Sequence, residues 1–313
     1  MRPPEARTLT PDPSPAERDR GGTSPLSHAS GRGAGGEGRR TNGAAENRVA
    51  DLIASSGIAA SEARSLLAFA LDASREWLIA HPQGPVGSTA ARRFGDLCGR
   101  RQAGEPMAYL LGEREFFGRR FAVDPSVLIP RPETEGLVEA ALHEMEGLSD
   151  PSILELGTGS GCVAIVLALE RPDARVVATD ASESALALAQ INAIELAAQA
   201  EFLHGDWYAP VRGRRFDLIV SNPPYIAAAD PHLAELGCEP RHALTDEGDG
   251  LSCLRTIIAG AGAHLNEVGA LVLEHGFDQG AAVRALMRQH GLGSVRTRAD
   301  LAGLERVCIA RHG

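Results

Sequence analysis

Apolar and polar positions alternate along the C-terminal half of the chain in a pattern typical of a parallel sheet. Short continuous apolar runs are separated by segments in which apolar residues recur every three or four positions. The seven runs are 152–157, 174–180, 200–206, 216–221, 269–275, 294–300 and 305–310. Apolar strands that alternate with amphipathic helices predict an α/β fold, with a seven-stranded, mostly parallel sheet covered on both faces. Only a short loop separates the last two runs, which predicts a closing hairpin with one antiparallel strand.

The N-terminal part of the chain has other patterns, which divide it into segments. Residues 1–46 are rich in Pro, Gly, Ser and Arg and lack apolar periodicity, so they are predicted to be a disordered tail, with a nucleic-acid-binding arm as the alternative. Residues 47–105 have helical spacing and predict a small helical domain. Residues 106–135 contain two short extended pieces around Gly118 and predict a β-hairpin linker. The remainder, 136–313, is the domain that contains the predicted sheet.

Composition excludes several kinds of chemistry. All 31 basic residues are arginine, so a P-loop lysine, a Schiff-base lysine and a lysine general base are absent. The net charge of −10 argues against a protein that wraps a nucleic-acid backbone. No apolar run approaches the roughly 18 residues of a membrane helix. The five cysteines are scattered, and no histidine has a metal-binding spacing. We therefore expect a cytoplasmic protein with no metal, no membrane contact and no direct nucleic-acid partner.

A glycine-rich loop, ELGTGSG at 155–161, ends the first predicted strand of the sheet and opens a helix. Glycines allow the backbone to turn sharply and to come close to a ligand. A plain strand-to-helix turn is the alternative interpretation of such a loop. The candidate cofactor-binding residues in it are Glu155, Gly157, Thr158, Gly159, Ser160 and Gly161.

Acidic residues near this loop indicate which cofactor it binds. Asp180 ends the second predicted strand, where a carboxylate reaches the hydroxyls of a ribose. The loop lacks the G-x-G-x-x-G spacing of a dinucleotide binder, and Glu155 suits a cationic group such as the sulfonium of S-adenosylmethionine; a turn-stabilising carboxylate is the alternative. After the third strand, Asp206 can accept from an adenine amino group, and Trp207 can stack on or line the ring.

The motif NPPY, Asn222 to Tyr225, follows the fourth predicted strand and is expected beside the methyl donor. A planar amide or amine nitrogen carries two N–H groups. The Asn222 side-chain carbonyl can accept one and the Pro223 backbone carbonyl the other, while Pro223 and Pro224 fix the loop. Tyr225 can pack on the planar group. Asn222, Pro223 and Tyr225 are therefore the candidate catalytic residues, and Asn222 to Tyr225 the substrate-binding ones.

From about residue 48 to the C-terminus, the sequence resembles the class I S-adenosylmethionine-dependent methyltransferases, which have a Rossmann-like sheet. More narrowly, it resembles the PrmC/HemK family, the N5-glutamine methyltransferases of peptide chain release factors. The pieces that carry the resemblance are EPMAYLLGEREFFGRRFAVDPSVLIPRPETE, ILELGTGSGCVAIVLA, GDWYAP, FDLIVSNPPYI and LVLEHGFDQGAAVR.

The resemblance implies methyl transfer from S-adenosyl-L-methionine to the glutamine of the Gly-Gly-Gln motif in class 1 release factors. It places the glycine loop, Asp180, Trp207 and Asn222 on the cofactor and NPPY on the glutamine. It also implies that the N-terminal helical domain helps to dock the release factor, and we expect a monomer. The alternatives are a glutamine methyltransferase of a ribosomal protein, an adenine-N6 DNA methyltransferase, which shares NPPY, and a non-catalytic nucleoside-binding module.

Overall fold

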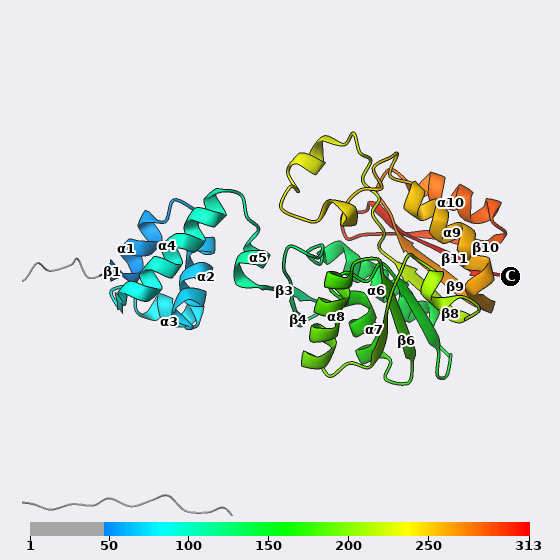
Figure 1. Cartoon of the computed structure of the whole chain (residues 1–313), viewed down its shortest axis with the longest axis horizontal. Coiled ribbons are helices and arrows are strands. Elements are labelled where there is room, and N and C mark those ends of the chain that lie inside the picture. The colour runs from blue at the N-terminus through cyan, green and yellow to red at the C-terminus, as the bar shows by residue number, and fades with distance from the viewer. Residues whose placement is uncertain (1–46) are drawn as a thin grey trace, which may run out of the picture. The chain divides into compact units, whose positions relative to one another are not determined.

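The computed structural model describes residues 47–313, so the predicted tail lies outside the described residues. Their central feature is a seven-stranded sheet with the strand order β10-β11-β9-β8-β5-β6-β7 (Figure 1). The strands are β5 (Ser152–Leu156), β6 (Arg175–Asp180), β7 (Ala200–His204), β8 (Phe216–Ser221), β9 (Leu265–Glu274), β10 (Leu292–Ala299) and β11 (Glu305–His312). β5 to β9 pair in parallel, and only β11 runs against its neighbours. The predicted α/β fold, with its closing hairpin, is confirmed.

Helices cover both faces of the sheet because successive strand residues, which point to opposite faces, are apolar on both. Ile153 and Val220 pack in one core with residues of α6, α7 and α8, and Leu154 and Ile219 pack in another with residues of α9 and α10. The helices are α6 (Glu135–Glu144), α7 (Cys162–Glu170), α8 (Glu183–Glu195), α9 (Ser252–His264) and α10 (Gly280–Gln289). This two-sided burial makes the sheet a rigid base for the loops at its edge.

The segment before the sheet forms short helices with a core of their own. The elements are β1 (Asn47–Arg48), α1 (Val49–Ser55), α2 (Ala60–Leu71), α3 (Arg75–Ala80), β2 (Pro85–Val86), α4 (Ser88–Gln102), α5 (Met107–Leu111), β3 (Glu113–Phe116) and β4 (Arg119–Ala122). Leu66, Leu78 and Phe94 are buried in this core. β3 and β4 form the hairpin predicted around Gly118. The sequence pattern predicts neither α3 nor α5, because six and five residues are too few for a repeating apolar spacing.

Helix α5 belongs to two cores, so it does not mark a clean boundary after residue 105. Its Leu110 packs with the helical segment, and its Tyr109 packs with Val127 and Ile129 in a separate small core. The Tyr109 hydroxyl also donates to the Val127 carbonyl at 2.6 Å. The division of the chain into domains therefore remains a prediction.

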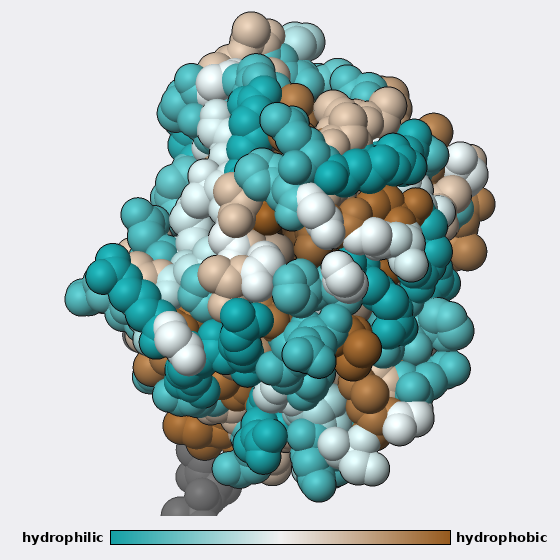
Figure 2. Space-filling view, turned by 90° about the vertical axis from the view of Figure 1, so that its right-hand side faces the viewer, coloured by the Kyte–Doolittle hydropathy of each residue, from teal (hydrophilic) through white to brown (hydrophobic). Residues whose placement is uncertain are grey.

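One face of the described part of the chain is mixed in character. On the face shown in Figure 2, hydrophilic side chains predominate and apolar ones lie between them in small groups, as is usual for a folded domain. Among the helices of residues 47–313, none combines the length and apolar character needed to cross a membrane.

Candidate active site

The carboxyl ends of β5 to β8 border a cavity of about 360 Å³. β5 lies between β6 and β8, so the loops after these strands diverge at this point of the sheet, where ligands of open parallel sheets bind. Predicted cofactor-binding residues that line the cavity are Glu155, Gly157, Thr158, Gly159, Ser160, Asp180, Asp206, Trp207 and Asn222. The fold thus brings together every residue of this predicted set except Gly161.

The glycine loop depends on backbone conformations that other residues rarely adopt. Gly157, Gly159 and Gly161 have φ angles of 73°, 55° and 81°. Gly161 precedes α7, and a Cβ there would lie 3.0 Å from Ala189 Cβ of α8. Its glycine therefore permits close packing of α7 against α8, whereas Gly157 and Gly159 open the loop toward the cavity.

Glu155 is a buried carboxylate on the wall of this cavity, 3% exposed. Its Oε2 accepts the Thr158 hydroxyl and the N–H of Ala164, the latter at 3.0 Å. Burial raises the pKa of Glu155 to about 8, although these two donors oppose the shift; the charge of Asp180 adds to it. The contacts of Oε2 are those of a turn-stabilising carboxylate, and a cation bound nearby would favour the ionised form of Glu155.

Asp180 joins the glycine loop to the end of β6. Its Oδ2 accepts the N–H of Gly159 and its Oδ1 accepts the N–H of Ser182, each at 2.9 Å. A carboxylate has further lone pairs, so these two bonds leave acceptor capacity toward the cavity. On the same wall, the Trp207 ring lies 3.6 Å from the position of a Cβ on Gly157. The indole therefore packs against the backbone of the loop and forms an aromatic side of the cavity.

Asn222 has a fixed amide orientation. Its Nδ2 donates to Thr134 Oγ1 at 3.1 Å, and Thr134 is itself buried, just before α6. Because the nitrogen is engaged with Thr134, the side-chain carbonyl of Asn222 is left to accept hydrogen bonds from a ligand. Pro224 lines the same cavity as Asn222.

A second cavity, of about 340 Å³, shares Asn222 with the first and is lined by Pro223, Tyr225 and Glu274. The Tyr225 hydroxyl donates to Glu274 Oε1 at 3.3 Å, whereas the buried Oε2 of Glu274 has no hydrogen-bond partner among residues 47–313. Burial raises the pKa of Glu274 to about 7, against the effect of neighbouring hydroxyls and of Arg306. Asn222 therefore stands where two cavities meet, and the second contains a carboxyl group of variable charge.

Sequence reasoning did not assign a role to three residues that contact the NPPY loop. Thr134 accepts a hydrogen bond from Asn222, and Glu274 accepts one from the Tyr225 hydroxyl. Gln279 donates one to the Tyr225 carbonyl. Their sequence context gives only a weak indication of function. They occur in the segments PRPETE and LEHGFDQG, which resemble the family but contain no motif with a chemical role of its own. Their function depends on contacts between residues 49 to 88 positions apart.

Two models of protein-domain families match segments of the chain. The model of the PrmC N-terminal domain matches residues 45–112, and that of the methyltransferase small domain matches residues 136–291. Among solved structures, the T. thermophilus 16S rRNA N2 G1207 methyltransferase in complex with AdoMet and guanosine aligns with a TM-score of 0.48 and 21% identity. The alignment covers 64% of this chain and 50% of that one.

Curated relatives match almost over their whole length. The release factor glutamine methyltransferase of Bordetella pertussis is 53% identical over 82% of this chain and 96% of its own. That of Burkholderia pseudomallei is 53% identical over 84% of this chain and 95% of its own, and that of Neisseria gonorrhoeae is 49% identical over 80% and 93%. With this identity over nearly all of the described residues, the chain belongs to the family of release factor glutamine methyltransferases.

Proposed function

We propose that this protein transfers a methyl group from S-adenosyl-L-methionine to the side-chain amide nitrogen of the glutamine in the Gly-Gly-Gln motif of class 1 release factors. The observation that carries the proposal is the position of Asn222. Its amide is oriented by Thr134 and borders both cavities, so it can contact a cofactor in one and a substrate in the other. The names of the curated relatives, which are release factor glutamine methyltransferases, support the same substrate.

The residues of the first cavity fit this cofactor. Its volume of about 360 Å³ lies within the usual range for small-molecule sites. Asp180 has acceptor capacity for ribose hydroxyls, Trp207 and Asp206 suit an adenine, and the buried Glu155 suits a cation. When bound, S-adenosylmethionine supplies an electrophilic methyl group on a sulfonium.

The NPPY loop orients the substrate nitrogen. The Asn222 side-chain carbonyl and the Pro223 backbone carbonyl each accept one N–H of the glutamine amide, and the two prolines offer no competing N–H. Tyr225 packs on the planar amide from the second cavity. Holding both hydrogens directs the nitrogen lone pair toward the methyl donor and stabilises the positive charge that develops on nitrogen.

The alternatives have less support. The relatives that match 82–84% of the chain carry the release factor function in their names, and residues 45–112 match the model of the PrmC N-terminal domain. Adenine-N6 methylation of DNA shares the chemistry at NPPY, but the net charge of −10 disfavours binding to a nucleic-acid backbone.

Mass spectrometry tests the proposal directly. Purified class 1 release factor incubated with the enzyme and S-adenosylmethionine is expected to gain one methyl group, and peptide mapping is expected to place it on the glutamine of Gly-Gly-Gln. Parallel reactions contain ribosomal proteins or adenine-containing DNA. A release factor of unchanged mass, together with a gain of one methyl group on either of the other substrates, would refute the proposed function.

The proposed role of Glu155 predicts that its replacement by glutamine, a neutral side chain of the same shape, changes the Kd for S-adenosylmethionine in a way that depends on pH. Below its pKa of about 8, Glu155 is largely neutral and resembles glutamine. Above that pH it is ionised and attracts a cationic ligand. The ratio of the Kd for S-adenosylmethionine in Glu155→Gln to that in the wild type should therefore rise from near unity at pH 6.5 to a plateau above pH 8.5. Isothermal titration calorimetry at each pH measures it. A ratio that is constant with pH would contradict this role.

A further inference from the structure

The connection from β8 to α9 builds parts of both cavities, so its shape controls the candidate active site. Near its start, Asn222 and Pro224 line the first cavity, and Pro223 and Tyr225 line the second. Near its end, Ala243 lines both. The two ends lie against each other: the N–H of Ile226 donates to the Leu244 carbonyl at 3.0 Å, and the N–H of Ala228 to the Gly248 carbonyl at 2.9 Å.

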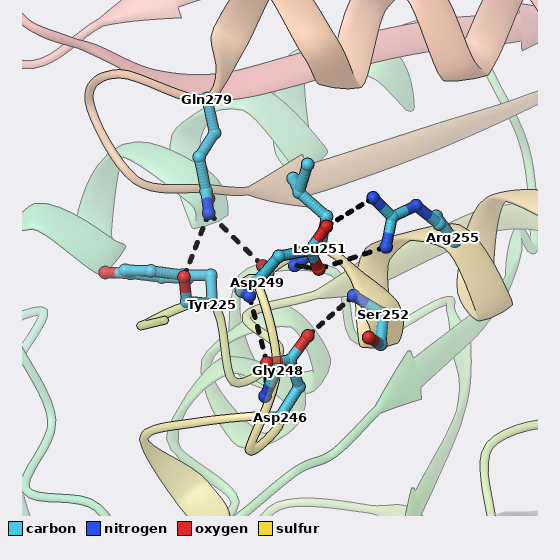
Figure 3. Close-up of polar contacts among 9 residues, drawn as sticks. Tyr225, Asp246, Gly248, Asp249, Leu251, Ser252, Arg255 and Gln279 are labelled. Carbon is cyan, nitrogen blue, oxygen red and sulfur yellow. Dashed lines mark hydrogen bonds and ion pairs between the residues drawn. The ribbon is translucent and has the colours of Figure 1, made fainter. Parts of the chain in front are cut away.

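One side chain from outside this connection holds its two ends together. Gln279 lies just before α10, and its Nε2 donates to the Tyr225 carbonyl at 2.9 Å and to the Gly250 carbonyl at 3.2 Å (Figure 3). Its Oε1 accepts the N–H of Gly276 at 2.9 Å, which orients the amide so that the nitrogen faces the two carbonyls. Both N–H groups of Gln279 and its oxygen are therefore in use.

The backbone around this contact leaves little freedom. Gly250 has a φ of 78°, and a Cβ there would lie 2.4 Å from the Tyr225 carbonyl oxygen, so the two backbones approach as closely as glycine permits. Asp246 fixes the Gly250 side, because its carboxylate accepts the N–H groups of Gly248, Gly250 and Ser252 at 2.8, 3.0 and 2.7 Å (Figure 3). The Gly250 carbonyl is thus a fixed point, and Gln279 ties Tyr225 to it.

The end of β9, shortly before Gln279, contacts the side chain of Tyr225. Glu274, five positions before Gln279, accepts the Tyr225 hydroxyl at Oε1, 3.3 Å away. The last residue of β9 and the turn that follows it therefore bond to Tyr225, at its hydroxyl and its carbonyl respectively. β9 itself pairs with β8 up to Ser221, the residue before Asn222, so the turn is held in register with the NPPY loop.

We propose that Gln279 is a positioning residue for methyl transfer, which acts through the Tyr225 carbonyl to set the NPPY loop relative to the segment that ends at α9. This inference rests on the proposed function. Gln279 borders neither cavity, so its effect is on the placement of Asn222, Pro223 and Tyr225 and not on contacts with a ligand. A small displacement of groups that orient a reacting nitrogen lowers the rate much more than it lowers binding.

Two substitutions of nearly equal size separate this role from simple space filling. Gln279→Glu replaces the donating nitrogen by an oxygen that repels both carbonyls, and Gln279→Met removes the hydrogen bonds without adding repulsion. We expect kcat to be highest in the wild type, lower in Gln279→Met and lowest in Gln279→Glu. The kcat of Gln279→Glu should be about 10- to 100-fold below that of the wild type. The Kd for S-adenosylmethionine should stay within about threefold. Gln289→Glu, at the exposed end of the same helix, is the matched control and should retain wild-type kcat.

Steady-state kinetics with release factor, calorimetry with S-adenosylmethionine, and hydrogen exchange of residues 225–230 and 244–250 measure these effects. Faster exchange in Gln279→Glu, together with the selective loss of kcat, is the expected result. Equal kcat for all variants, or a parallel loss of cofactor affinity and thermal midpoint, would overturn the inference. If Gln279→Glu does not fold, Gln279→Met carries the test. A wild-type enzyme that does not methylate release factor contradicts the proposed function instead, while the exchange data still decide the role of Gln279.

Discussion

Replacement of Asn222 by alanine is expected to lower kcat for methyl transfer by roughly 10²- to 10³-fold, the usual loss when one preorganised polar group of a catalytic site is removed. In the proposed mechanism the Asn222 carbonyl accepts an N–H of the substrate amide as charge develops on the nitrogen, so its loss should act on the transition state more than on binding. Asn222 also borders the first cavity, so the Kd for S-adenosylmethionine should rise as well, but only a few-fold. Single-turnover transfer to release factor and calorimetry measure the two effects separately.

Variants of Thr134 serve as controls for the orientation of this amide. Thr134→Val removes the oxygen that accepts from Asn222 Nδ2 and should reduce kcat by about fivefold, since one hydrogen bond contributes about 1 kcal/mol. Thr134→Ser retains the hydroxyl and should remain close to the wild type. An Asn222→Ala enzyme with full activity on release factor would falsify the mechanism. Equal rates for the two Thr134 variants would show that the amide needs no support from this side.

The fold and the position of the site were predictable because both follow from local patterns. Apolar runs gave the strands, and the carboxyl ends of parallel strands meet at one edge, so Asp180 and Asn222 had to lie near the glycine loop. That inference needs only the order of the elements and the direction in which each strand runs. Their roles in binding and catalysis remain predictions, which the variants described above test.

The residues that support the site were not predictable in the same way. Thr134 lies 88 positions from Asn222, and Gln279 lies 54 positions from Tyr225. No periodicity encodes a contact between a turn and a strand end that are so far apart in sequence, since it depends on how helices α6 and α10 pack. Gly161 shows the converse: the motif predicts a cofactor contact, but packing of α7 on α8 already requires a glycine there.

Replacement of Asp180 by alanine is expected to weaken binding of S-adenosylmethionine by about 100-fold. The carboxylate accepts the N–H groups of Gly159 and Ser182. We propose that its remaining lone pairs accept ribose hydroxyls of the cofactor. Hydrogen bonds to a charged group contribute about 1.5–3 kcal/mol each. Loss of two such bonds to the ligand, at the lower value, therefore corresponds to about two orders of magnitude in Kd. Calorimetry with the purified variant measures it.

Asp173→Ala is the matched control, because Asp173 is an exposed carboxylate just before the opposite end of β6, where it pairs with Arg171. It should bind the cofactor as the wild type does. In the proposed site Asp180 contacts the ribose, a part of the cofactor that does not react, so its interactions should be equal in the ground and transition states. At saturating S-adenosylmethionine, kcat of Asp180→Ala should then stay within a few-fold of the wild type while the KM for the cofactor rises, the reverse of the pattern for Asn222→Ala. A fall in kcat with an unchanged KM would place Asp180 in the reaction step instead of the ribose site.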